Sequence, residues 1–392
     1  MKATSTEAEA GFHGFFYLGV KEIEPITSRN SSSFHGTGQI IEAHRAYIRP
    51  KTTLLIGLFL GLVMLMIWSI SVGSYDMSLM EILQTILGLE EGPHKIVVWG
   101  IRMPRIMASI ITGFGLGLSG LATQSLLRNP LASPFTLGIS QGAAFGAAFS
   151  IVVLGAAGMQ QSTLLTADGN TFTILNVYAV TFSAFLGAIT ATVVILLLAR
   201  LKKMSPQSII LAGVALSSLF TSGTILIQYF ATDVEIATVV FWTFGDVARS
   251  TWQEIGLLGC VTLFVIIYFV FHRWNLNALA AGDDSARGLG VEINRLRLAG
   301  MFLAALVAAL ATAFHGVIAF LGLLAPHIAR CLAGSDHGLL IPYSCLVGAL
   351  LLLTADTLGR LLVGSGTLPV GVLTSFMGAP LFLYLLMKGP NR

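Results

Sequence analysis

Apolar residues occur in long, nearly unbroken runs from about residue 53 to the end of the chain, separated by short polar turns. A run of about 20 residues, rising 1.5 Å per residue in a helix, crosses about 30 Å of hydrocarbon. The alternating segments of about 10 residues that are typical of membrane β-barrels are not visible. Because backbone polar groups inside a bilayer must pair with one another, these runs predict helices. The pattern indicates an all-α polytopic membrane protein.

Ten helices of spanning length are expected in this pattern. The predicted spans cover residues 53–73, 101–127, 136–156, 174–200, 207–230, 253–272, 294–314, 316–333, 339–358 and 369–388. The span at 316–333 is the weakest, since Gly316, Gly322 and Pro326 interrupt it. Two more polar stretches, 74–95 and 233–252, are expected to form short helices at the membrane surface, with Trp residues at interfacial depth in the second.

Composition supports the membrane class. Hydrophobic residues make up 55% of the 392 residues and charged residues only 10%, against about 25% in soluble domains. The three cysteines, Cys260, Cys331 and Cys345, are scattered and form no CxxC pair, so they are interpreted as small hydrophobic residues. Residues 1–50 are polar and have no signal-peptide pattern, which predicts a mostly flexible cytoplasmic tail.

The distribution of Lys and Arg predicts the orientation. With the N-terminus inside, all but five of the 22 Lys and Arg residues fall on the cytoplasmic side. The five outer residues are Lys95, Arg102, Arg105, Arg249 and Arg360. The bias predicts that both termini, and the polar stretch 276–295, face the cytoplasm.

That stretch reads LNALAAGDDSARGLGVEINR and contains alternating capping and apolar residues. Asn277 is expected to cap a short helix over 278–281 that Gly282 ends. Asp283 or Asp284 is expected to cap a second short helix that stops at Gly288 or Gly290. The result is a cytosolic knob shaped to enter a groove on another protein, with these positions presented: Leu279, Ala280, Asp283, Ser285 and Leu289.

Three of the outer arginines admit two interpretations. Arg102 and Arg105 lie in RMPR at the start of a predicted span, and Arg360 lies at the end of another. They either extend their charges to the membrane surface or form a docking patch for an acidic partner, and the residues alone leave both open. Asp356 and Arg360, four apart on one helical face, can also pair locally.

Catalytic and nucleotide-binding motifs are not supported. The glycine-rich segment GLGLSG, 115–120, follows no strand and has no nearby carboxylate to hold a ribose, so it does not indicate a dinucleotide site. Its small residues, Gly113 with Gly117 and Gly115 with Ser119, instead predict close helix packing. No GxxxxGK[ST] occurs, so the chain is not expected to hydrolyse ATP. His327, next to Pro326, is either structural or functional.

Several segments, in this order, resemble the FecCD family of ABC transporter permeases, the membrane subunits of importers for ferric siderophores, haem and cobalamin. The resemblance runs from about residue 53 to residue 388. It rests on RMPRIMASIITGFGLGLSGLATQSLLRNPLASPFTLGISQGAAFG, LAGVALSSL, FWTFGDV, LNALAAGDDSARGLGV, GVIAFLGLLAPHIAR, ADTLGR and LPVGVLTSFMGAPLFLYLL. The 50-residue N-terminal segment lies outside it.

The resemblance implies a type II importer permease of ten helices in the cell membrane, paired with a second copy or a close homologue. It implies a path lined largely by the fifth helix, two cytoplasmic ATPases that carry ATP and Mg, and an extracytoplasmic binding protein. The chain itself would bind no cofactor or metal. The implied coupling residues are Leu279, Ala280, Gly282, Asp283, Ser285, Ala286, Arg287, Leu289 and Gly290. The docking residues would be Arg102, Arg105 and Arg360, and the cytoplasmic gate would comprise Ser205, Pro206 and Gln207.

The expected function is therefore import of an iron(III)-siderophore, cobalamin, haem or similar chelate by alternating access. An ion-coupled secondary transporter is the main alternative, and it would need intramembrane carboxylates, which are nearly absent from the sequence. A membrane-bound enzyme is a third possibility, but the sequence offers no catalytic cluster.

Overall fold

The computed structural model describes residues 37–73, 75, 77–89, 92–156, 170–202, 205–363 and 368–388. The chain divides into two compact units, 1–49 and 50–392, and the features below belong to the second. Most of the predicted N-terminal tail lies outside the described residues. Its last part is helical, because α2 begins at Thr37. Helix α2 thus extends into residues 37–49 of the predicted tail, where Glu, Ala, Arg and Gln favour a helix, and the mostly flexible tail stays a prediction.

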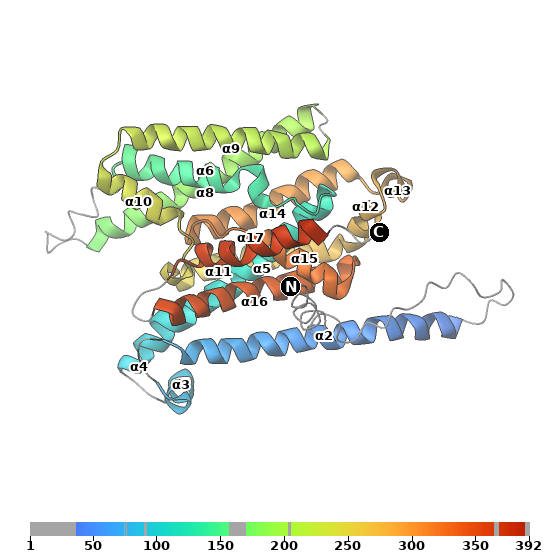
Figure 1. The fold of residues 1–392 in the computed structure, drawn as a ribbon, viewed down its shortest axis with the longest axis horizontal. Helices are drawn as coiled ribbons and strands as arrows, with labels where there is room; N and C mark the ends of the chain where they lie inside the picture. Colours follow the sequence, from blue (N-terminus) through green and yellow to red (C-terminus); the bar gives the residue numbers. More distant parts are fainter. Residues whose placement is uncertain are drawn as a thin grey trace, which may run out of the picture. The chain divides into compact units, whose positions relative to one another are not determined.

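Helices make up the described chain, with no β-strand among the described residues (Figure 1). In chain order they are α2 (Thr37–Ser71), α3 (Leu79–Ile86), α4 (Pro93–Lys95), the π-helical η1 (Ile96–Arg102), α5 (Met103–Leu126), the 3-10 turn η2 (Pro134–Leu137), α6 (Ile139–Ala148), the π-helical η3 (Phe149–Val153), α8 (Asn170–Lys202), α9 (Pro206–Tyr229), α10 (Asp233–Thr243), the 3-10 turn η4 (Val247–Arg249), α11 (Trp252–Phe271), α12 (Arg273–Ala280), α13 (Asp283–Gly288), α14 (Ile293–His315), α15 (Leu321–Ala333), α16 (His337–Val363) and α17 (Val370–Lys388).

Seven helices of the described chain are long and apolar enough to cross a membrane. Three further apolar helices, at Ile139–Val153, Leu321–Ala333 and Val370–Tyr384, are shorter. All ten coincide with predicted spans. The membrane class is confirmed, whereas a crossing by each of the three shorter helices stays a prediction.

The predicted helix at 316–333 begins too early. Residues 316–320 are not helical: Gly316 has a φ of +76°, Val317 forms an isolated parallel bridge with Phe244, and Phe320 is left-handed with a φ of 63°. Gly371 N, at the start of α17, also donates to Gly245 O at 3.0 Å, so α17 bonds to the segment that pairs with Val317. The bridge of Val317 with Phe244 and the left-handed backbone of Phe320 interrupt the helix, so α15 begins only at Leu321.

Helix α5 forms the centre of the second unit and packs against α11, α14, α15 and α16 (Figure 1). A Cβ atom added to Gly117 would lie 2.3 Å from Ser344 O of α16, and one added to Gly115 would lie 2.7 Å from Val307 Cγ1 of α14. Ser119 donates its hydroxyl to Ala304 O of α14 at 2.5 Å. The predicted close packing through small residues is confirmed on both faces of α5.

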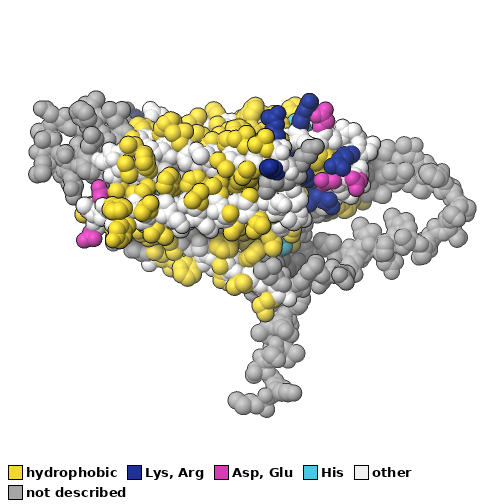
Figure 2. All heavy atoms as spheres, turned by 90° about the horizontal axis from the view of Figure 1, so that it is seen from above, with side chains coloured by type: hydrophobic (Ala, Val, Ile, Leu, Met, Phe, Trp, Pro, Cys, Tyr) yellow, Lys and Arg dark blue, Asp and Glu magenta, His cyan; other side chains and the backbone are white. Residues whose placement is uncertain are grey.

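The two predicted short helices are present as α3 and α10, and their location at the membrane surface stays a prediction. Each starts with a capping box, in which a Ser or Thr hydroxyl accepts from the backbone of a Glu that bonds back: Ser78 with Glu81 in α3, and Thr232 with Glu235 in α10. Lys and Arg side chains gather at the end that carries α12 and α13 (Figure 2). Such an asymmetry is what the positive-inside rule requires of a cytoplasmic end.

Candidate functional site

The polar stretch 276–295 folds into two short helices, as predicted, but with different caps. Helix α12 starts at Arg273, directly after α11, and Asn277 lies inside it rather than at its cap. Gly282, with a φ of +127°, forms the corner, and α13 starts at Asp283. The predicted cap at Asn277 is wrong because Leu276 and Leu279, three apart, are both buried and extend the helix toward α11.

Asn277 instead joins α12 to the rest of the molecule. Its amide nitrogen donates to Asp336 Oδ1 at 2.7 Å, and its amide oxygen accepts from the backbone nitrogen of His337 at 2.9 Å. His337 Nε2 lies 2.8 Å from Ser125 Oγ at the end of α5. Burial alone would raise the pKa of Asp336, but hydrogen bonds from Asn277 and Gly338 bring that pKa below its usual value. Sequence reasoning missed this link because the residues are distant in the chain.

Asp283 ties α13 to two other elements. Its carboxylate lies 3.3 Å from Arg297 Nη2 of α14 and 3.6 Å from Arg128 Nη1, which follows α5. Arg297 Nε also donates to Leu126 O at 2.9 Å. Together with the Asn277 contacts, these bonds fix the two short helices to α5, α14 and α16.

Fewer of the predicted residues are exposed on the knob than the sequence indicated. Leu279 and Ala286 have no exposed surface, and Asp283 is half-buried, so Leu279 is not presented and that prediction is wrong. Leu289 is 73% exposed. We define the outer knob face as the exposed members of the predicted set: Ala280, Ser285, Arg287, Leu289 and Gly290.

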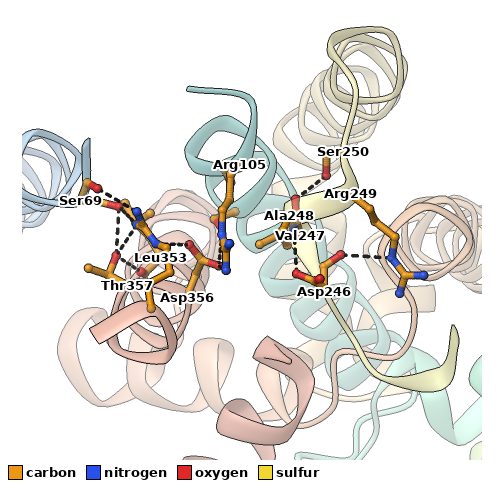
Figure 3. Close-up of polar contacts among 12 residues, drawn as sticks. Ser69, Arg105, Asp246, Val247, Ala248, Arg249, Ser250, Leu353, Asp356 and Thr357 are labelled. Carbon is orange, nitrogen blue, oxygen red and sulfur yellow. Dashed lines mark hydrogen bonds and ion pairs between the residues drawn. The ribbon is translucent and has the colours of Figure 1, made fainter. Parts of the chain in front are cut away.

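At the opposite end, Asp356 binds two of the three predicted docking arginines, Arg105 and Arg360. Figure 3 shows Arg105 pointing toward Asp356. Arg105 Nε donates to Asp356 Oδ1 at 2.8 Å, and Arg105 Nη2 lies 2.8 Å from the same oxygen. Arg360 Nε lies 3.3 Å from Asp356 Oδ2, an ion pair outside hydrogen-bond geometry. The local pairing predicted for Asp356 and Arg360 is confirmed, and Arg105 is an additional partner.

Other guanidinium nitrogens of Arg360 and Arg102 donate to backbone carbonyls at the end of α2. Arg360 Nη1 donates to Ser69 O at 3.1 Å and Val72 O at 2.8 Å. Arg102 Nη1 donates to Ile70 O at 2.7 Å, and Gly73 leaves room for that guanidinium. These bonds satisfy carbonyls that a helix end leaves unpaired.

The three arginines are thus held within the protein and show little surface: Arg102 is 5% exposed and Arg105 is 7% exposed. Among the described residues, Asp356 is the carboxylate that pairs with Arg105 and Arg360. An acidic partner would therefore be attracted by the positive electrostatic potential of these buried arginines, and not by arginine side chains that extend into solvent.

The predicted gate residues begin α9. Ser205 caps the helix, its hydroxyl accepting from Ser208 N at 3.3 Å, and Pro206 occupies the first turn. Gln207 is exposed. These contacts explain the local fold, and the gate role stays a prediction.

The described chain has long apolar helices and a charged end that carries the anchored two-helix knob, and its sequence contains no phosphate-binding loop. These features define the class of this chain as a membrane permease. The chain belongs to the FecCD transport family, which it matches over residues 61–388.

Relatives support the same family. An ABC transporter permease protein of Methanocaldococcus jannaschii is 47% identical, with 90% of this chain and 99% of that protein covered. The permease protein of the Fe(3+)-citrate import system of Bacillus subtilis is 38% identical, with 86% and 95% covered. Among solved structures, an inward-facing conformation of a metal-chelate type ABC transporter matches with a TM-score of 0.72 and 30% identity, covering 86% of this chain and 99% of the other.

Proposed function

We propose that the chain is the permease subunit of an ATP-binding-cassette importer that carries a metal chelate, such as an iron(III)-siderophore, into the cytoplasm. Relatives are named as permeases for iron(III) citrate, hemin and vitamin B12. The observation that carries the proposal is the knob of α12 and α13, exposed on one side and anchored to three membrane helices on the other.

The proposed partners follow from the family. Two cytoplasmic ATPases hold ATP and Mg and contact the outer knob face, while a second permease copy completes the pathway. An extracytoplasmic binding protein delivers the chelate to the arginine end, and both termini face the cytoplasm. No cofactor is assigned to this chain.

The anchoring supports a mechanism of alternating access. When the ATPases close on ATP, they displace the knob. Because Asp283 and Asn277 connect the knob to α14, α16 and the end of α5, the displacement tilts these helices as a group. The pathway thereby opens to one side of the membrane at a time.

An ion-coupled transporter is less well supported. Such a protein requires a carboxylate that can exchange an ion inside the membrane. Among the described residues, the carboxylate fully buried in a span is Asp356, and two arginines neutralise it. The relatives also point to ABC permeases.

Reconstitution tests the proposal directly. The permease, its ATPase and its binding protein are placed in proteoliposomes and uptake of a radiolabelled iron(III) chelate is measured. We expect uptake that requires ATP and stops when the ATPase is omitted. Uptake that persists without the ATPase and follows an imposed proton gradient would refute the ABC assignment.

Docking at the arginine end is tested by removing one charge. Arg102→Gln is expected to weaken association with the binding protein about two- to tenfold at low ionic strength, with a smaller effect in high salt. Titration of the immobilised permease with the binding protein measures this. Lys95→Gln, at an exposed outer lysine away from the cluster, is the matched control. An equal effect of both changes would show that the cluster has no special role.

A further inference from the structure

A small cavity borders the knob at the charged end of the molecule. It has a volume of about 290 Å³ and lies where the end of α5, the turn that follows it, α12, α15 and the start of α16 meet. Among the described residues that line it, Arg128 and Arg330 are basic and none is acidic. Sites for organic ligands usually measure about 300–1,000 Å³, so this volume suits a small anion.

Arg330 is the first cation of this cavity. It lies in the last turn of α15 and is half-buried. Its guanidinium group forms no ion pair and no hydrogen bond with any other described residue. Because a charged group that is partly withdrawn from water loses hydration, an anion in the cavity would stabilise this side chain.

Arg128 is the second cation, in the turn after α5. Its Nη1 atom lies 3.6 Å from Asp283 Oδ1, and 45% of its side chain is exposed. Asp283 lies closer to Arg297, at 3.3 Å. A guanidinium group has five N–H donors, so Arg128 keeps donors for a ligand in the cavity that it lines.

Gln124 adds an independent observation, because it is a buried acceptor without a donor. It lies one helical turn before Arg128, lines the same cavity and is only 2% exposed. Its Nε2 atom donates to Leu323 O at 3.5 Å, whereas its Oε1 atom has no hydrogen-bond partner among the described residues. A ligand that carries a hydroxyl group would satisfy this oxygen.

The other polar groups near the cavity are already paired. Ser125 Oγ and His337 Nε2 lie 2.8 Å apart, so they bond to each other. Asp336, next to His337 in the chain, does not line the cavity, and its Oδ1 atom accepts from Asn277 and from the backbone of Gly338. The cavity therefore offers two guanidinium groups and one unpaired amide oxygen to a ligand.

We infer that this cavity binds a phosphate group that keeps a hydroxyl, either inorganic phosphate or a phosphate monoester. Arg128 and Arg330 bind the charged oxygens, since guanidinium groups match phosphate in shape and charge. Gln124 Oε1 accepts from the P–OH group. Sulfate has the same shape but no hydroxyl at neutral pH, so it would leave Gln124 without a donor. The inference concerns binding by this chain alone and does not depend on the cargo or on the proposed function.

Binding of radiolabelled inorganic phosphate tests the inference. The full chain is placed in nanodiscs of phosphatidylcholine, and equilibrium dialysis at fixed pH and ionic strength gives the Kd, with sulfate as the competitor. The test variants are Arg330→Gln and Gln124→Met. The matched control is Arg295→Gln, because Arg295 pairs with Glu292 at 2.8 Å on the surface, is 85% exposed and does not line the cavity.

We expect saturable phosphate binding that Arg330→Gln weakens about tenfold or more, whereas Arg295→Gln leaves it unchanged. Sulfate should bind about tenfold or more weakly than phosphate, and Gln124→Met should reduce that preference. If Arg330→Gln does not fold, Arg128→Gln, at a partly exposed position, is measured and should also weaken binding. Absence of saturable phosphate binding, equal affinity for phosphate and sulfate, or unchanged binding in the arginine variants would overturn the inference.

The source of the phosphate group is distinguished by the lipid. The same titration is repeated in nanodiscs that contain phosphatidic acid, a lipid with a phosphate monoester. Loss of the binding of labelled phosphate would identify the lipid as an occupant, and unchanged binding would identify a soluble phosphate. Both results agree with a phosphate site.

Discussion

Ala280→Glu combined with Leu289→Glu is expected to reduce ATP-driven uptake about tenfold or more while the chain still inserts into the membrane. Both residues are exposed on the outer knob face, so the change leaves the internal packing intact. Two carboxylates buried without partners in an ATPase groove cost several kcal/mol, which weakens the contact that transmits force. Uptake into proteoliposomes and co-purification of the ATPase are the two measurements.

Leu87→Glu is the matched control, because Leu87 is 63% exposed and follows α3, far from the knob along the chain. It makes the same chemical change and should leave ATPase co-purification unaltered. Retained uptake in the double variant would show that the knob does not receive the force. Loss of folded protein would instead indicate a structural defect, which the amount of inserted protein reveals.

Asp356→Ala is expected to lower the free energy of unfolding by about 3–5 kcal/mol, because it leaves the buried guanidinium groups of Arg105 and Arg360 without their carboxylate. Asp356 joins Arg105 of α5 to Arg360 of α16, and Arg360 also bonds to the end of α2, so the loss should reduce the yield of folded protein. Thermal unfolding of the purified protein in detergent measures the change.

Asp284→Ala provides the matched control for that variant. Asp284 pairs with Arg287 at 3.3 Å, but its side chain is fully exposed, so removal should have an effect near zero. Adding Arg105→Met to Asp356→Ala should recover part of the stability, since one uncompensated charge disappears with it. A double variant less stable than Asp356→Ala would contradict the ion-pair explanation.

The helices themselves could be predicted well from the sequence, because apolar runs of spanning length have few other structures available in a bilayer. The error at 316–333 arose where the chain is apolar but not helical. Val317 pairs with Phe244, and such pairing between distant segments has no periodic signature. The early start of α2 at Thr37 was missed because its polar composition also fits a flexible tail.

The candidate site was predicted in part. Two short helices were expected at 276–295 and are present, yet the outward direction of Leu279 was wrong, because its burial depends on neighbouring helices. The arginines were expected either to extend to the membrane surface or to form a docking patch, and the structure engages them with Asp356 and the end of α2. Capping residues and residue spacing indicate where a helix begins and ends. They do not indicate which side of that helix packs against the rest of the protein.

By itself, the sequence determined the membrane class, the position of most helices and the two-helix knob, because hydrophobic length and capping chemistry act over a few neighbouring residues. Only the tertiary structure decided that Asn277 joins α12 to His337 and that Asp356 holds Arg105 and Arg360 together. These features depend on contacts between residues far apart in the chain, and the packing of α5 against its neighbours creates the geometry in which they form.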